Sequence, residues 1–177
     1  MAEDNTSLFL EFRAGNRVYR VPRRGYYFNN TDCWAQFDGS RARTGLSCLV
    51  CHDQREILTF KPPRIGLKVS IFDRLCSFTT KGISLEVNSP VTGTVTSFNH
   101  DLLKSPGLVK ADPYRAGWVV ELDLCDPEGD LEFLTGCSEY YSSLKTRMES
   151  VPGRGCPCTR LGRAYRTTGS ERQVEHS

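Results

Sequence analysis

Several features that would define a class of function are missing from this sequence. No apolar run approaches the ~18 residues of a membrane-spanning helix. The first residues, MAEDNTSLFLEF, carry acids where a secretory signal peptide carries bases. Neither sign of charge dominates, since 23 lysines and arginines against 21 acids leave a formal net charge of +2. This balance gives no overall basis for binding nucleic acid or a membrane surface, so we expect a cytoplasmic protein that binds neither.

Signatures of catalysis are missing as well. The phosphate-binding pattern G-x-x-x-x-G-K-[ST] and the dinucleotide-binding pattern G-x-G-x-x-G do not occur. The three histidines, at positions 52, 100 and 176, are too scattered to suggest an acid–base pair, and no hydrolase-type Ser/His/Asp order is found. We therefore expect a non-catalytic protein.

Cysteine, in contrast, is abundant for a reducing compartment, with 8 residues in 177. Cys48, Cys51 and His52 have the C-x-x-C-H spacing of covalent haem attachment, but that chemistry normally requires export. A zinc or iron–sulfur site that adds Cys156 and Cys158 is another interpretation, although C-P-C is not the second C-x-x-C of a strong zinc signal. A third interpretation is that Cys48 and Cys51 form a redox-active pair. The favoured interpretation is that these cysteines are small apolar residues and that no metal is bound.

Short alternating segments bounded by Gly and Pro predict a mostly β fold. Strand character is found in FLEF, RVYRVP and WVVELDL, and the turn Asp38-Gly39 joins two further strands within residues 26–46. Along residues 83–88, Ile83, Leu85 and Val87 share one face of an alternating strand. The pattern favours a β-rich α+β domain of short hairpins.

Two helices are predicted from capping and periodicity. Ser47 is a suitable cap for a short helix that reaches Leu58. Near the C-terminus the period changes, and Tyr141, Leu144 and Met148 share one face of a helix that begins at about Ser138.

The domain organisation follows from shifts in composition. Residues 1–25 form an N-terminal extension and residues 26–150 form the folded domain, which we expect to be monomeric. Residues 151–177 are rich in Gly, Arg and Ser and contain few core residues, so they are predicted to be disordered. The arginines of this tail suit solvent exposure better than contact with an acidic partner or RNA.

Several motifs occur together in one order and spacing. They are SPVTGTV at residues 89–95, Asn99, ADPYRAGW at residues 111–118 and the pair Cys33-Trp34. Over roughly residues 26–149 this pattern resembles the glycine cleavage system H protein, a relative of the lipoyl domains. The resemblance implies a lipoyl-type barrel-sandwich hybrid of hairpins with a C-terminal helix, in which Trp118 fills the core. It also implies a carrier whose lipoic acid, joined by an amide to a hairpin lysine, moves between partner enzymes.

The sequence departs from the family at this lysine. Counted from either side, the family's lysine falls on Gly82, and Lys81 stands one residue earlier. Thr79 replaces the family's glutamate, and Phe72 replaces a glycine that precedes the hairpin. Lys81-Gly82 can still form a two-residue turn if Gly82 takes a positive φ.

We therefore expect an H-like protein without a lipoyl arm, which docks partner enzymes through the hairpin Thr79, Thr80, Lys81 and Gly82. The first alternative is a working carrier with lipoate on Lys81, in glycine cleavage or in an H-like sulfur pathway. The second alternative is a metal-binding or redox module that uses the cysteine pair at positions 48 and 51.

Overall fold

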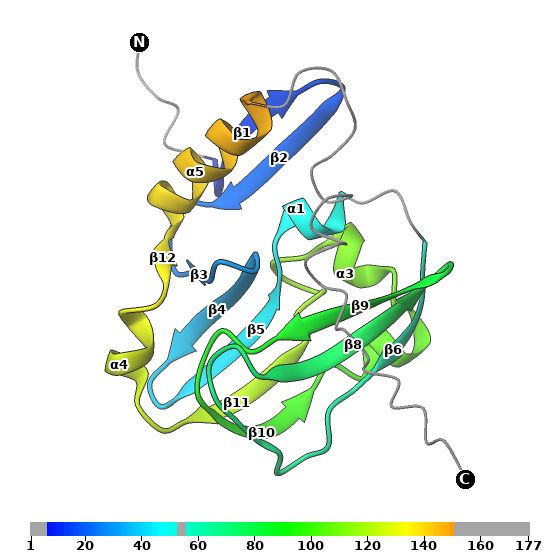
Figure 1. Ribbon diagram of the computed structural model, residues 1–177, viewed down its shortest axis with the longest axis vertical. Helices are drawn as coiled ribbons and strands as arrows, with labels where there is room; N and C mark the ends of the chain where they lie inside the picture. Colours follow the sequence, from blue (N-terminus) through cyan, green and yellow to red (C-terminus); the bar gives the residue numbers. More distant parts are fainter. Residues whose placement is uncertain (1–6, 53–55, 151–177) are drawn as a thin grey trace, which may run out of the picture.

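The computed structural model describes residues 7–52 and 56–150, which form three sheets and five helices (Figure 1). The two-stranded sheet pairs β1 (Phe9–Ala14) with β2 (Arg17–Pro22). The seven-stranded sheet has the order β12 (Thr135–Gly136), β3 (Tyr27–Phe28), β4 (Cys33–Asp38), β5 (Arg41–Leu46), β11 (Val120–Leu124), β10 (Gly93–Phe98) and β7 (Lys68–Val69). The three-stranded sheet has the order β6 (Ile57–Lys61), β8 (Arg74–Thr80) and β9 (Ile83–Asn88). The helices are α1 (Cys48–Cys51), α2 (Asp101–Lys104), α3 (Leu108–Ala111), α4 (Pro127–Leu131) and α5 (Cys137–Glu149).

The main core lies between the seven-stranded and three-stranded sheets. Alternating strands supply it, because one face of each strand is apolar. Fully buried examples are Phe78 on β8, Val95 on β10 and Leu122 on β11. The predicted mostly β fold with a C-terminal helix is confirmed. In the described ranges, no helix is both long and apolar enough to cross a bilayer.

A second core joins the N-terminal hairpin to the rest of the molecule. In Figure 1, α5 and the β1–β2 hairpin lie together at one end of the sandwich. The buried face of α5 consists of Cys137, Tyr140, Leu144 and Met148. The predicted helix is confirmed, but Tyr140 rather than Tyr141 is its buried tyrosine, stacked on Phe28 at a centroid separation of 3.9 Å.

The helix predicted from Ser47 to Leu58 is wrong in its length. Helix α1 ends at Cys51, and Ile57 already belongs to β6, where it pairs with Thr80. A long-range strand pairing therefore overrides the local helical pattern. Ser47 precedes the helix without capping it through its side chain, and its hydroxyl lies 2.9 Å from that of Tyr140.

Trp118, predicted to fill the core, packs against the second core without being fully buried in it. Trp118 is half-buried and lies under the Arg43 guanidinium, 5.0 Å from it, whereas Trp34 is fully buried. The Trp34 indole donates to the carbonyls of Leu46 and Pro113, at 3.0 and 3.2 Å. A buried indole needs such an acceptor, and Trp34 has two.

Helix α4 was not predicted, although its signals are local. The Asp126 side chain accepts from the Gly129 N–H at 3.0 Å, and Pro127 occupies the first helical position. Both are standard features of a helix start.

Candidate functional site

The β8–β9 hairpin ends in a tight two-residue turn. Thr80 pairs with Ile83, so only Lys81 and Gly82 lie between the strands. Gly82 has a φ of +91°, and the Thr80 hydroxyl donates to the Ile83 carbonyl at 3.0 Å. The turn anticipated from the sequence is therefore present. Its tip lies at the edge of the molecule in Figure 1.

Lys81 is exposed at this tip. It forms no ion pair with a carboxylate among the described residues. Its side chain therefore faces solvent, where an enzyme can reach it. Nothing in the hairpin holds Lys81 in one orientation.

The base of the hairpin is fixed by the SPVTGTV motif. The Ser89 carbonyl accepts from the Phe72 N–H and the Asp73 carbonyl accepts from the Ser89 N–H, both at 2.8 Å. Phe72, at a position where the resemblance predicts a glycine, has a φ of +71°. A bulky residue rarely adopts this conformation, so the turn has a backbone that favours glycine.

Exposed apolar side chains lie on the elements beside the hairpin. Ile83 begins β9 and is 37% exposed, and Leu58, on the neighbouring strand β6, is 46% exposed. Leu103, on helix α2 packed against β6, is 51% exposed. Thr79 is half-buried and Thr80 is buried. We call Leu58, Ile83 and Leu103 the hairpin patch.

The cysteine motif is placed away from this hairpin. Cys48 is buried, and burial raises the pKa of its thiol, which disfavours the thiolate that redox or metal chemistry needs. The described residues contain no group of three or more His, Cys, Asp or Glu side chains able to hold a metal. The Cys51 side chain and the tail residues Cys156 and Cys158 lie outside what the structure describes.

His52 is engaged by the N-terminal hairpin. Its Nε2 lies 2.8 Å from the Val18 carbonyl, and its ring packs edge-on against Tyr19 at 4.7 Å. Burial lowers the pKa of His52, and the charges of Arg17 and Lys110 lower it further. The neutral ring is therefore the form that the fold stabilises.

This environment predicts a loss of stability in mild acid. Because the pKa of His52 is lower in the folded chain than its ordinary 6.5, the unfolded chain binds the proton first as the pH falls. The free energy of unfolding should thus be highest above pH 6.5 and should decrease below it. Urea titrations from pH 8 to pH 5 should show a weaker pH dependence for His52→Gln. Equal curves for the wild type and His52→Gln would contradict the prediction.

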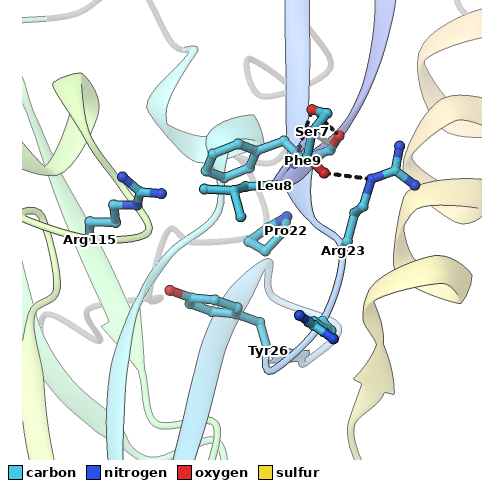
Figure 2. Close-up of a pocket in the computed structure, with 8 residues that line it drawn as sticks. Ser7, Leu8, Phe9, Pro22, Arg23, Tyr26 and Arg115 are labelled. Atoms are coloured by element: carbon cyan, nitrogen blue, oxygen red, sulfur yellow. Dashed lines mark hydrogen bonds between the residues drawn. The ribbon is translucent and has the colours of Figure 1, made fainter. Parts of the chain in front are cut away.

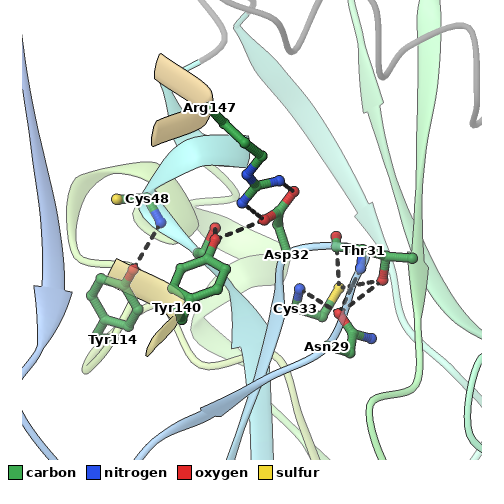
Figure 3. Close-up of polar contacts among 9 residues, drawn as sticks. Asn29, Thr31, Asp32, Cys33, Cys48, Tyr114, Tyr140 and Arg147 are labelled. Carbon is green, nitrogen blue, oxygen red and sulfur yellow. Dashed lines mark hydrogen bonds and ion pairs between the residues drawn. The ribbon is translucent and has the colours of Figure 1, made fainter. Parts of the chain in front are cut away.

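A buried polar network links α5 to the segment before β4 (Figure 3). Arg147 contacts both carboxylate oxygens of Asp32, at 2.7 and 3.3 Å, and the Tyr140 hydroxyl donates to Asp32 at 2.8 Å. Asp32 is only 1% exposed and has a φ of +60°, a conformation that Asp tolerates better than most residues. No motif in the sequence predicts that Asp32 and Arg147 form a contact. We interpret this network as structural.

Tyr114, in the ADPYRAGW motif, connects the same core to the N-terminal hairpin. Its hydroxyl donates to the Arg20 carbonyl and accepts from the Cys48 N–H, both at 3.0 Å. Burial raises the pKa of Tyr114 well above its usual value. The motif was found in the sequence, but this bonding role was not.

The comparisons with known proteins agree with this architecture. The family model of the glycine cleavage H-protein matches residues 26–147, so the chain belongs to that family. It is 31% identical to the glycine cleavage system H protein of Synechocystis sp., over 68% of this chain and 92% of the relative. It is 30% identical to the mitochondrial H protein 2 of Arabidopsis thaliana, over 60% of this chain and 68% of the relative.

A solved structure shares the fold. The crystal structure of a glycine cleavage system H protein from Mycobacterium marinum aligns with a TM-score of 0.62 at 18% identity. The alignment covers 71% of this chain and 99% of that one. The lipoyl-type fold implied by the motifs is thus confirmed, and the chain is H-protein-like.

Proposed function

We propose that this chain is a non-catalytic H-type protein that docks partner enzymes through the β8–β9 hairpin and carries no lipoyl arm. The proposal is supported by the motif spacing, which assigns the family's lysine position to Gly82, and by the structure, in which Gly82 lies inside a two-residue turn. Glycine has no amine, so this position cannot form an amide with lipoic acid. Docking of partners is the part of an H protein's role that remains.

The geometry of the turn supports a glycine at this position. A lysine at position 82 would have to adopt a φ of +91°, which costs an L-residue roughly 1–2 kcal/mol. A shift of the strand register by one residue would instead turn the fully buried Phe78 away from the core. A lysine could therefore reach position 82 only with a strained backbone or with a register shift that exposes core residues, and both lower the stability of the fold.

The hairpin patch supports docking. Three large apolar side chains, at positions 58, 83 and 103, lie exposed around a turn that is itself polar. Protein interfaces combine exposed apolar side chains of this kind with neighbouring polar groups. We infer that the partners are enzymes of the glycine cleavage type or other lipoate-dependent enzymes, because the family's carriers serve such enzymes.

Lys81 supports a second candidate, a carrier with lipoate on that residue. Its exposed amine has the chemistry that amide formation requires, and it stands at the tip of a tight hairpin. If lipoate were bound there, it would supply a disulfide–dithiol couple, and the role of this chain would be to expose the attachment point. The two candidates differ in a single covalent bond.

Mass spectrometry separates the two candidates. The chain should be co-expressed with a lipoate ligase and lipoate, together with Lys81→Arg, Gly82→Lys and a lysine-bearing H protein as positive control. We expect an unmodified mass for the wild type and a lipoyl adduct on the control. An adduct on a Lys81-containing peptide, lost in Lys81→Arg, would replace the armless proposal with the carrier.

A second experiment measures the docking of partner enzymes. Biolayer interferometry against the glycine decarboxylase, aminomethyltransferase and dihydrolipoamide dehydrogenase of one source should detect at least one interaction. We expect Leu58→Ser/Ile83→Ser to weaken it roughly thirtyfold, because each of the two exposed apolar anchors contributes about 1 kcal/mol and about 1.4 kcal/mol corresponds to a factor of ten. The control Phe133→Ser removes another large apolar side chain, which is 60% exposed and lies just after α4, on the opposite side of the molecule from the hairpin tip in Figure 1. Equal loss in both variants would contradict docking at the hairpin.

A further inference from the structure

A groove lined by basic residues lies between the N-terminal hairpin and the segment that follows α3. Two neighbouring cavities form it, with volumes of about 440 and 590 Å³, and both are lined by Phe9 and Arg115. Figure 2 shows the first cavity, in which Leu8, Phe9 and Pro22 lie between Arg23 on one side and Arg115 on the other. We define the basic groove by six residues: Arg17, Arg20, Arg23, Arg24, Lys110 and Arg115.

Most of this positive charge is not neutralised. Arg20 pairs with Glu11 at 2.8 Å, and among the described residues lining the two cavities only Asp112 is acidic. One Asp112 oxygen accepts from the Ala116 N–H at 3.1 Å. Four arginines form no ion pair with a described carboxylate: Arg17, Arg23, Arg24 and Arg115.

Neutral groups hold three of these arginines in place. Arg17 donates to the His52 carbonyl and Arg23 donates to the Ser7 carbonyl, both at 2.8 Å. The Arg115 guanidinium lies 6.0 Å from the centre of the Phe9 ring. A backbone carbonyl or a ring orients a guanidinium without cancelling its charge, and the remaining N–H groups stay available for a carboxylate.

We propose that the basic groove binds an extended acidic segment of a partner protein, with an apolar side chain of that segment resting on Leu8 and Phe9. The cations lie on both sides of Phe9, so a single small anion can contact only some of them, whereas an extended chain can reach all. Leu8 is 64% exposed between them and offers an apolar contact. The groove is short and the net charge of the chain is only +2, which suits a short acidic segment better than a long polyanion.

This site is distinct from the hairpin of the proposed function. The β1–β2 hairpin lies outside residues 26–147, the part that the family model matches. The groove is therefore built where this chain adds a hairpin to the family's domain. A partner held here would bind H-type chains that carry this hairpin and would not bind those that lack it.

Fluorescence anisotropy on the full chain tests the proposal. The probe is a labelled peptide in which two pairs of glutamates flank one leucine. We expect saturable binding whose affinity decreases as the salt concentration rises. The affinity should also be roughly tenfold lower for Arg23→Glu/Arg115→Glu. The matched double reversal Arg64→Glu/Lys68→Glu changes two exposed basic residues that do not line the groove, and it should bind like the wild type.

Two further variants keep the result interpretable. Arg23→Gln/Arg115→Gln retains hydrogen-bond donors and should also weaken binding, which separates loss of charge from misfolding. Leu58→Ser/Ile83→Ser should leave peptide binding unchanged, which separates this site from the hairpin patch. The proposal is overturned if the peptide does not bind, if both charge reversals weaken it equally, or if a poly-uridine oligonucleotide binds the groove and the peptide does not.

Discussion

Replacing Arg147 with methionine is expected to lower the free energy of unfolding by about 3 kcal/mol. The substitution leaves the Asp32 carboxylate, which is 1% exposed, without a cationic partner among the described residues, although the Tyr140 hydroxyl still donates a hydrogen bond to it. Removing the partner of a buried charge is strongly destabilising, and because the Arg147 side chain is itself 37% exposed, we expect the lower end of the range for buried ion pairs. Urea unfolding followed by tryptophan fluorescence measures the loss.

Two comparison variants test the cause. In Asp32→Asn/Arg147→Met both charges are removed, and asparagine tolerates the φ of +60° at this position. This double variant should be more stable than Arg147→Met alone. The control Lys145→Met breaks an exposed pair with Glu149 at 3.9 Å and should cost less than about 0.5 kcal/mol. If Lys145→Met were as harmful as Arg147→Met, loss of a side chain from α5 would explain both results.

Replacing Gly93 with alanine is expected to cost about 3 kcal/mol, the upper end of the usual range for overpacking. A Cβ at this position would collide with the Asp123 carbonyl oxygen and would lie only 3.1 Å from its carbonyl carbon. Gly93 pairs with Leu124 on one side and Val69 on the other, so the backbone cannot move away freely. The strand would have to separate from β11 to accommodate one methyl group.

Gly107→Ala is the matched control for this substitution. A Cβ at Gly107 meets no atom within 4 Å, and the φ of −63° suits alanine. Alanine should therefore be neutral or stabilise the fold by up to about 1 kcal/mol, by reducing the freedom of the unfolded chain. A loss below 1 kcal/mol for Gly93→Ala in urea unfolding would show that the sheet relaxes around the methyl group.

The local features of this protein were predictable because their causes are local. Alternation between Ile83 and Val87 predicts a strand from the pleat alone, and the change of period after residue 137 predicts a helix. The Lys81-Gly82 turn follows from the permissive backbone of glycine. Family membership was also predictable, since the spacing of SPVTGTV and ADPYRAGW is written directly in the chain.

Other features depend on pairings across long distances in the sequence. The helix expected from Ser47 was cut short because Ile57 pairs with Thr80 in a sheet. Gly93 is required because the backbone of β11 approaches it closely, where a Cβ would collide with the Asp123 carbonyl. Each outcome was set by a partner strand that no local window of sequence contains.

The sequence by itself determined the class of the fold and the Lys81-Gly82 hairpin, because each rests on residue type and spacing. Only the tertiary structure placed Asp32 against Arg147, 115 residues away, and gathered the arginines of β2 and of the ADPYRAGW segment into one groove. The physical reason is that charge and burial act through space. Their effect depends on which distant segments the core brings together, and local patterns carry no record of that packing.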